Sequence, residues 1–387
     1  MAEFTCQILN SMNEIDESLW QQCQNDEAAS LFTSYRFLKL LETSGSACSQ
    51  TGWIPSHLVI YQQKQVVAVM PLFVKLHSFG EYIFDWAWAE AYQKHQLEYY
   101  PKLLSASPFT PVAGERLLIN KQYQDQSDEI FTIVSEQLKA LANRFNAQMV
   151  QQLFNSHSQN EKFTELGWIS RENVQYHWLN RDYQNFAQFL DVMTSRKRKT
   201  IVKERNAVTA AGIKIQTLMG CDIDEHIWQQ FYQFYQLTYF KRSGHQGYLT
   251  LEFFKQLSLE LPEQTLLKLA FDGDGLVAGA LFFVDNNALY GRYWGCQQDY
   301  RFLHFELCYY QGIEYCIEHQ LQCFNSGAQG EHKIKRGFEP VKTYANYLIF
   351  NPMFNDAIGD YLTREKSLNQ QHITWAKQQL PFKVTSS

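Results

Sequence analysis

The chain has 387 residues, of which 45% are hydrophobic, 15% aromatic and 19% charged, and its formal net charge is −6. This length predicts two or three domains with sizeable cores, and the negative charge excludes a protein that coats nucleic acid non-specifically. No stretch approaches the roughly 20 uncharged apolar residues of a membrane span, and the N-terminus lacks a basic region followed by an apolar run. We therefore expect a cytoplasmic protein without a membrane span.

The cysteines argue against disulfides and against a metal centre. All eight are scattered, without a Cys-x-x-Cys pair, and this favours reduced thiols. Cys316, His319 and Cys323 have no fourth ligand nearby in the sequence, so we expect no metal.

The first half of the chain predicts a mixed sheet with helices on its faces. In chain order we expect a helical region at 14–42, strands at 57–61, 66–75 and 81–86, a helix at 86–100, a bent or edge strand at 102–119, an amphipathic helix at 128–144, a strand at 148–154, a helix at 160–166 and a strand at 174–179.

The second half predicts a similar alternation of helices and strands. We expect helices at 185–193 and 195–211, a strand at 213–218, helices at 224–239 and 251–259, a hairpin of strands 266–271 and 276–284, a strand at 288–296, a helix at 305–319, strands at 321–325 and 341–350, and a last helix at 355–379. The hairpin turn, Asp272-Gly273-Asp274-Gly275, is a strong turn signal.

The two hairpins align without gaps at an offset of 210 residues, 58–75 on 268–285. Tyr61 falls on Phe271, and the polar turns coincide. Either any two apolar hairpins look alike, or the chain holds two copies of one mixed-sheet fold. We favour two copies, with a boundary near residue 180.

The stretch from Cys323 to Pro340 is unusual in composition. Three glycines (Gly327, Gly330 and Gly337) flank a run of acidic and basic residues. Glycines let a backbone approach a ligand closely, and cations stabilise negative charge in a transition state. A solvated turn with a charge run is the alternative.

Four stretches resemble FemAB-like proteins, which are associated with peptidoglycan biosynthesis. They are 77–85 (HSFGEYIFD), 99–112 (YYPKLLSASPFTPV), 195–205 (SRKRKTIVKER) and 327–338. The resemblance implies an α/β (α+β) fold of two tandem acetyltransferase-like (GNAT-like) domains, each a mixed, mostly antiparallel sheet flanked by helices. With the boundary above, these are 1–180 and 181–387, the second with the C-terminal helix.

The resemblance also implies an N-acyltransferase that moves an aminoacyl or acyl group to an amine of a small molecule, peptide or cell-wall-precursor-like acceptor. Acyl transfer needs a proton acceptor and a donor for the oxyanion. The predicted catalytic residues are Lys335, Glu331, Asp85, Glu81 and His332. The predicted substrate-binding residues are His77, Tyr99, Tyr100, Lys102, Arg292, Gly330 and Arg336. Each of these residues could instead have a purely structural role.

The donor is open between aminoacyl-tRNA and acyl-coenzyme A, and no other cofactor is expected. Relatives have a basic helix start where this chain has Arg196, Lys197, Arg198 and Lys199, so the resemblance implies that this local patch binds donor phosphates or tRNA. A solvated face is the alternative for the patch. The long two-helix arm of some relatives is missing, and Ile334 replaces an aromatic residue before Lys335.

Coenzyme A usually binds a glycine-rich turn before a helix, and the turn at 297–304 has no glycine. A second interpretation is a recognition module that binds a peptide or glycopeptide without chemistry.

Overall fold

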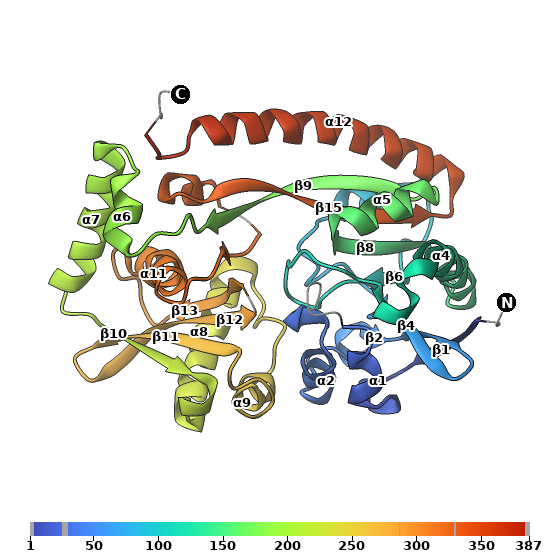
Figure 1. Ribbon diagram of the computed structural model, residues 1–387, viewed down its shortest axis with the longest axis horizontal. Coiled ribbons are helices and arrows are strands. Elements are labelled where there is room, and N and C mark those ends of the chain that lie inside the picture. The colour runs from blue at the N-terminus through green and yellow to red at the C-terminus, as the bar shows by residue number, and fades with distance from the viewer. Residues whose placement is uncertain (1–3, 25–29, 286, 329, 384–387) are drawn as a thin grey trace. The chain divides into compact units, whose positions relative to one another are not determined.

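The computed structural model describes residues 4–24, 30–285, 287–328 and 330–383. The chain forms two compact units (Figure 1), and each is assembled from two segments. Unit 1 comprises Met1–Asn173 and Lys342–Gln370, and unit 2 comprises Val174–Val341 and Gln371–Ser387. No described helix is long and apolar enough to span a membrane.

Unit 1 is built from two sheets and the helices that cover them. Its strands are β1 (Phe4–Leu9), β2 (Trp53–Pro55), β3 (His57–Gln62), β4 (Gln65–Met70), β5 (Phe73–Lys75), β6 (Lys102–Ser105), β7 (Leu118–Ile119) and β8 (Met149–Asn155). Its helices are α1 (Glu17–Gln21), α2 (Tyr35–Thr43), α3 (Trp86–Lys94), α4 (Ser127–Arg144) and α5 (His157–Glu165). One sheet has the order β1-β3-β4-β7. In the other, β2, β5, β6 and β8 are neighbours in that order, and the end of β15 (Glu339–Ile349) pairs with β8.

Two expectations for unit 1 are corrected by the structure. The strand expected at 81–86 is a loop, and α3 begins at Trp86; Glu81 and Asp85 are turned inward there, toward a buried lysine described below. The single strand expected at 102–119 is split into β6 and β7. The amphipathic helix expected at 128–144 is confirmed as α4. The expected helical region at 14–42 contains α1 and α2, and its residues 25–29 lie outside the described residues.

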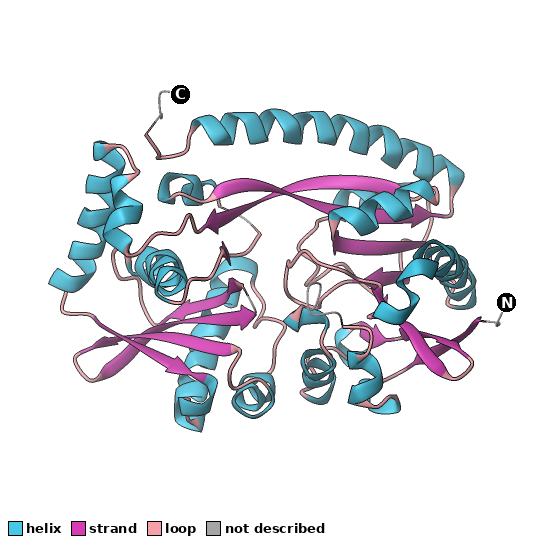
Figure 2. Cartoon of the chain, in the orientation of Figure 1, coloured by secondary structure: helices cyan, strands magenta, loops and turns pink. Residues whose placement is uncertain are grey.

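Unit 2 holds one sheet with helices on it (Figure 2). Its strands are β10 (Lys214–Met219), β11 (Thr265–Asp272), β12 (Gly275–Asp285), β13 (Ala288–Cys296) and β14 (Cys323–Asn325), in that order, followed by the end of β9 (Ile169–Leu179). Its helices are α6 (Phe186–Asp191), α7 (Ser195–Ala210), α8 (Glu225–Ser243), α9 (Leu251–Glu260), α10 (Leu303–Phe305), a π-helical turn (Glu306–Tyr310) and α11 (Gln311–Glu318). The last helix of the chain, α12 (Pro352–Gln378), contributes residues to both units.

The predicted repeat is confirmed by the strand registers. In unit 1 the antiparallel β3–β4 register shifts between Ile60 and Tyr61, and in unit 2 the β11–β12 register shifts between Ala270 and Phe271. These positions are 210 residues apart, the offset of the sequence alignment. A β-bulge is a specific local feature, so two hairpins with a bulge at the same place are equivalent parts of one repeated fold.

The equivalence extends beyond the hairpins. β6 pairs with β5 and β8 as β13 pairs with β12 and β14, antiparallel on one side and parallel on the other. By these registers Leu104 corresponds to Tyr290, and Gln151 corresponds to Asn325.

Unit 1 has an insertion at this strand. Leu118 corresponds to Gly295, because both pair with equivalent residues of the preceding strand. Thirteen residues lie between Leu104 and Leu118 but four lie between Tyr290 and Gly295, so unit 1 has nine additional residues that divide its strand.

Candidate functional site

Unit 1 contains a buried cluster of charged side chains on its second sheet. Lys75 of β5 and Lys102 of β6 are directly opposite each other, and both are fully buried. The ammonium group of Lys102 donates to Ser78 Oγ at 2.8 Å, to Glu81 Oε2 at 2.8 Å and to Asp85 Oδ2 at 2.6 Å. These bonds draw the loop that follows β5 onto the sheet.

The cluster includes all six residues of unit 1 that the sequence singled out: His77, Glu81, Asp85, Tyr99, Tyr100 and Lys102. The hydroxyl of Tyr99 donates to Asp85 Oδ2 at 2.6 Å, and the Tyr100 hydroxyl lies 2.8 Å from Ser78 Oγ. His77 donates from Nε2 to the carbonyl of Thr51 at 2.8 Å. The structure therefore brings these predicted residues together, although their predicted roles in catalysis and binding stay predictions.

The charged groups of the buried cluster have pKa values that are shifted in different directions. Burial raises the pKa of Glu81 to about 7 in spite of Lys102. Burial opposes the charge of Asp85, yet Lys102 and the Gln151 side chain bring the pKa of Asp85 down to about 2. Burial lowers the pKa of Lys75 to about 6, and its Nζ lies 3.7 Å from the centre of the Trp53 ring. At neutral pH the cluster holds a fixed Lys102–Asp85 ion pair, while Glu81 titrates.

The loop over this cluster has an apolar outer face. Leu76, Phe79, Phe84 and Trp86 are 48%, 47%, 53% and 38% exposed. The Phe79 and Trp86 rings contact each other, with centroids 5.1 Å apart. Exposed apolar groups that gather in one place mark interaction sites more often than scattered ones do. The loop is therefore polar toward the sheet and apolar toward solvent.

In unit 2, β13 and β14 are the strands that correspond to β6 and β8 of unit 1, and they stop pairing after a short contact. β13 and β14 pair over three residues, which end at Tyr290 and Asn325. The chain then turns at Gly327, whose φ is +93°. Arg292 of β13 donates to Asn325 O at 3.2 Å and to Asn325 Oδ1 at 3.3 Å. Arg292, which was predicted to bind substrate, thus lies where the strands stop pairing.

Lys333 is the buried amine at this place. It is 1% exposed, and its Nζ donates to the carbonyls of Ser326 at 3.1 Å and of Gly327 at 2.8 Å. Among the described residues no carboxylate forms an ion pair with it. Burial, with a smaller effect of Arg292, lowers the pKa of Lys333 to about 7.

The 3₁₀ helix Glu331–Arg336 places its basic residues on opposite sides. Lys333 and Arg336 are three residues apart, one turn of such a helix, and both are buried. Lys335, the predicted oxyanion donor, is exposed. Together with burial, Lys335 lowers the pKa of Lys197, so Lys335 lies near the start of α7. Its predicted role at the acyl carbonyl stays a prediction.

The other predicted residues of this stretch differ in their surroundings. Arg336 donates to Tyr310 Oη at 2.9 Å and to Glu204 Oε2 at 2.7 Å, so it is held in an internal network. Glu331 is exposed. Gly330 has a φ of +119°, and a Cβ there would lie 2.5 Å from the His332 ring. Glycine is therefore required beside His332.

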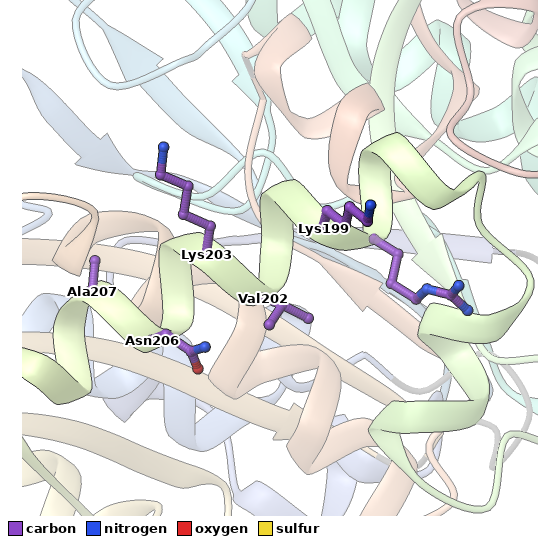
Figure 3. Close-up of a pocket in the computed structure, with 6 residues that line it drawn as sticks. Lys199, Val202, Lys203, Asn206 and Ala207 are labelled. Carbon is purple, nitrogen blue, oxygen red and sulfur yellow. The ribbon is translucent and has the colours of Figure 1, made fainter.

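The predicted donor-binding residues lie at the start of α7. Arg196 and Lys199 are exposed, Lys197 and Arg198 are half-buried, and Arg198 donates to Asp191 Oδ1 at 2.8 Å. Further along, Lys199 and Lys203 project from one side of α7 and Val202 and Asn206 from another (Figure 3), and these side chains line a surface hollow. The basic first turn opposes the helix dipole.

Comparison with known proteins identifies the family. A family model described as peptidoglycan biosynthesis/recognition, FemAB-like, matches residues 11–384. The chain belongs to the FemAB-like family. No curated protein matches the sequence.

Solved structures show the fold of this FemAB-like protein. A crystal structure of FemX has a TM-score of 0.55 at 12% identity, covering 92% of this chain and 100% of that chain. The C-terminal domain (DUF2156) of a putative lysylphosphatidylglycerol synthetase from Agrobacterium fabrum has a TM-score of 0.53 at 9% identity, covering 89% and 96%. A tandem GNAT protein from the clavulanic acid biosynthesis pathway has a TM-score of 0.48 at 10% identity, covering 90% and 99%.

The predicted fold class, two tandem copies of a mixed sheet flanked by helices, is confirmed by the likeness to FemX and to the Agrobacterium fabrum domain and by the repeated register. The description of the family associates the chain with peptidoglycan biosynthesis or recognition. No group of histidine, cysteine or carboxylate side chains suited to a metal ion occurs within the described residues.

Several residues of these sites were missed by sequence reasoning. Lys75 and Gln151 belong to the unit 1 cluster, and Lys333 is the buried amine of unit 2. The sequence contained a signal for Lys75, because this charged residue ends an apolar strand two residues before His77. Lys333 had none that separated it from Lys335, since both lie in one basic run.

Proposed function

We propose that this FemAB-like protein is a cytoplasmic N-acyltransferase. It moves an aminoacyl or acyl group from aminoacyl-tRNA or acyl-coenzyme A to an amine of a peptide or cell-wall-precursor-like acceptor. The observation that carries the proposal is the buried amine of Lys333, beside the point where β13 and β14 separate. The family description supports the class of acceptor.

The proposed reaction forms one bond and breaks one. The acceptor nitrogen bonds to the acyl carbon, and the bond from that carbon to the donor's oxygen or sulfur breaks. The nitrogen loses a proton, and the leaving oxygen or sulfur gains one. A general base with a pKa near the working pH is most effective for such a transfer.

The lowered pKa of Lys333 and its two hydrogen bonds support this role. A neutral amine has two N–H groups and one lone pair, and the carbonyls of Ser326 and Gly327 accept two hydrogen bonds from Nζ. The lone pair therefore stays available for a proton. A pKa of about 7 leaves a large neutral fraction at physiological pH. We assign proton transfer to Lys333, directly or through water.

Substitutions of two lysines in one 3₁₀ helix, Lys333 and Lys335, test the assignment of the general base. We expect Lys333→Ala to lower kcat by about 100-fold or more, the typical effect of losing a general base. Lys335→Ala, which removes the same side chain from an exposed position of the same helix, serves as the matched control. Small primary amines added to the buffer should restore activity to Lys333→Ala and should not affect Lys335→Ala. Urea unfolding of both variants shows whether the fold is kept.

The result that contradicts the assignment is specific. If folded Lys333→Ala retains activity, Lys333 is not the base. If Lys335→Ala instead loses kcat, the predicted role of Lys335 at the carbonyl is supported.

The donor is tested by binding. We expect charged tRNA to bind at low salt, to weaken steeply as salt is raised, and to be lost when Arg196, Lys197, Arg198 and Lys199 are replaced by Gln. A matched control replaces four exposed lysines elsewhere, Lys64, Lys94, Lys121 and Lys214. Saturable binding of acyl-coenzyme A alone would instead assign that donor.

A second candidate function is recognition of a peptide or glycopeptide without chemistry. The exposed apolar loop of unit 1, above all Phe79 and Trp86, favours it. On this hypothesis Phe79→Ala with Trp86→Ala abolishes binding of a muropeptide, and purified wild-type protein shows no transfer with any donor. Transfer activity in the wild type would reject it.

A further inference from the structure

A buried arginine ties the 3₁₀ helix Glu331–Arg336 to two other elements of unit 2. Arg336 is 6% exposed. Its guanidinium group donates to Tyr310 Oη at 2.9 Å, to Glu204 Oε2 at 2.7 Å and to the carbonyl of His332 at 2.9 Å. The Tyr310 hydroxyl also donates to Glu204 Oε2. One side chain therefore joins the 3₁₀ helix to α7, which carries Glu204, and to the π-helical turn, which carries Tyr310.

Two aromatic residues beside this network also contact the 3₁₀ helix. The Tyr309 hydroxyl lies 2.8 Å from His332 Nε2, and the centroid of the Phe305 ring lies 3.5 Å from Arg336 Cζ. Turns of π-helix, such as the one that carries Tyr309, occur frequently at functional sites. Both the carbonyl and the ring of His332 are thus bonded, and His332 is the residue before Lys333.

The burial of Lys333 depends on where this helix lies. Lys333 and Arg336 are one turn of a 3₁₀ helix apart, so their side chains leave the same side of it. Lys333 is 1% exposed, and its Nζ donates to the carbonyls of Ser326 and Gly327. A 3₁₀ helix has poor hydrogen-bond geometry of its own. This short helix therefore needs other contacts to stay in one place, and the Arg336 network supplies them.

The network is better suited to fixing a position than to stabilising the fold. Taking Glu204 and Arg336 out of water costs free energy that their attraction only partly returns, so apolar side chains in the same space would be at least as stable. A guanidinium group, however, donates in fixed directions. Hydrogen bonds to acceptors on three elements therefore permit one placement of the 3₁₀ helix.

We propose that Glu204, Tyr310 and Arg336 are positioning residues that hold Lys333 in its buried place against the carbonyls of Ser326 and Gly327. The proposal rests on the proposed function, in which Lys333 is the general base, and it adds the residues on which that base depends. Breaking the network frees the 3₁₀ helix and lets water reach Lys333 Nζ.

Water at Nζ changes the protonation of Lys333. Burial is the main cause of its lowered pKa, about 7, so hydration raises that pKa toward its ordinary value. A rise from about 7 to about 8 lowers the neutral fraction at about pH 7 roughly fivefold and leaves it nearly unchanged at about pH 9. The charged and titratable groups that act on Lys333, or on which it acts, are Arg292 of β13, Cys308 of the π-helical turn, His177 of β9, His304 of α10 and His332.

The experiment measures kcat/KM against pH for the wild type, Arg336→Lys and Glu204→Gln. We expect the ratio of variant to wild type to be about fivefold lower at about pH 7 than at about pH 9, where it should lie within about twofold of one. The ratio removes the ionisation of the acceptor amine, which is common to all the proteins. A general loss of packing would lower the ratio equally at both pH values, and that result overturns the proposal.

Arg205→Lys is the matched control. Arg205 is the neighbour of Glu204 in α7, but it donates to Glu306 and Glu314 and not to the 3₁₀ helix. The same substitution there should leave kcat/KM within about twofold of the wild type at both pH values. A fall in this control like that of Arg336→Lys would also overturn the proposal.

A second measurement does not require transfer activity. Brief acetylation with acetic anhydride, followed by mass spectrometry of the peptides, reports the pKa and reactivity of Lys333, with the exposed Lys335 as internal reference. We expect Lys333 to titrate at higher pH in both variants and to react faster than in the wild type at about pH 9. Unchanged titration of Lys333 overturns the positioning role even if the wild type is active. A shifted titration in the variants, without transfer by the wild type, overturns the proposed function and leaves the positioning role in place.

Discussion

Replacing Lys102 by Met should destabilise unit 1 strongly. Lys102 is fully buried, and its removal leaves Glu81 and Asp85, 3% and 2% exposed, without their hydrogen-bonded cation. Breaking one side of a buried ion pair costs about 3–5 kcal/mol. Asp85 keeps its bonds from Tyr99 and Gln151, and Glu81 can take up a proton since its pKa is already about 7. We therefore expect the lower end, about 3 kcal/mol.

The pH dependence of this loss tests the electrostatic explanation. Without Lys102 the folded-state pKa of Glu81, already raised to about 7, rises further, and that of Asp85 rises above its unfolded value. The folded state then binds more protons than the unfolded state, so the variant's deficit is largest at about pH 8 and shrinks toward about pH 5.

Urea unfolding, followed by tryptophan fluorescence, measures the deficit. Lys139→Met is the matched control, because Lys139 is 39% exposed and pairs with Glu136 at 2.8 Å on the surface; its expected cost is less than about 1 kcal/mol. A deficit for Lys102→Met below about 1 kcal/mol, or one that grows as pH falls, would refute the reasoning.

Two other predictions concern unit 2. The folded pKa values of His177, His304 and His332, about 3, 3 and 4, lie below the unfolded value of about 6.5. The unfolded state therefore binds protons first, and stability present above about pH 6.5 is lost as pH falls through these values; urea midpoints that stay constant from about pH 7 to about pH 4 would contradict this. Gly295→Ala would place a Cβ 2.3 Å from the backbone of Phe234 in α8. We expect a cost of about 1–3 kcal/mol, whereas Gly275→Ala, with its nearest contact at 3.5 Å, should cost far less in the same urea assay.

Local patterns in the sequence predicted much of the fold. The Asp-Gly-Asp-Gly turn and the apolar runs around it predicted one hairpin, and its alignment at an offset of 210 identified the other. The spacing of apolar residues at 128–144 was also sufficient to predict α4. These features depend on neighbours in the chain, and such neighbours are visible in a sequence.

Contacts between residues that are distant in sequence explain the features that could not be predicted. In the stretch 81–86, aromatic residues occupy every second position, as on one face of a strand, but Phe84 and Trp86 face solvent and Asp85 faces inward. The reason is Lys102, a buried cation distant in sequence. In the Lys333–Lys335 run, the choice of the buried lysine depends on the 3₁₀ turn, which the sequence did not indicate.

Unit 1 can be completed only late in synthesis, because its two segments are far apart in the chain. Its final segment, Lys342–Gln370, carries most of β15, which pairs with β8 from Tyr344 to Ile349. The ribosome makes this segment only after Val174–Val341 of unit 2. Until then the nascent chain exposes one edge of β8, and an open edge of this kind recruits other strands. A product that ends prematurely before Lys342 would keep that edge permanently, so incomplete translation of this chain should yield an aggregating species and not a functional half.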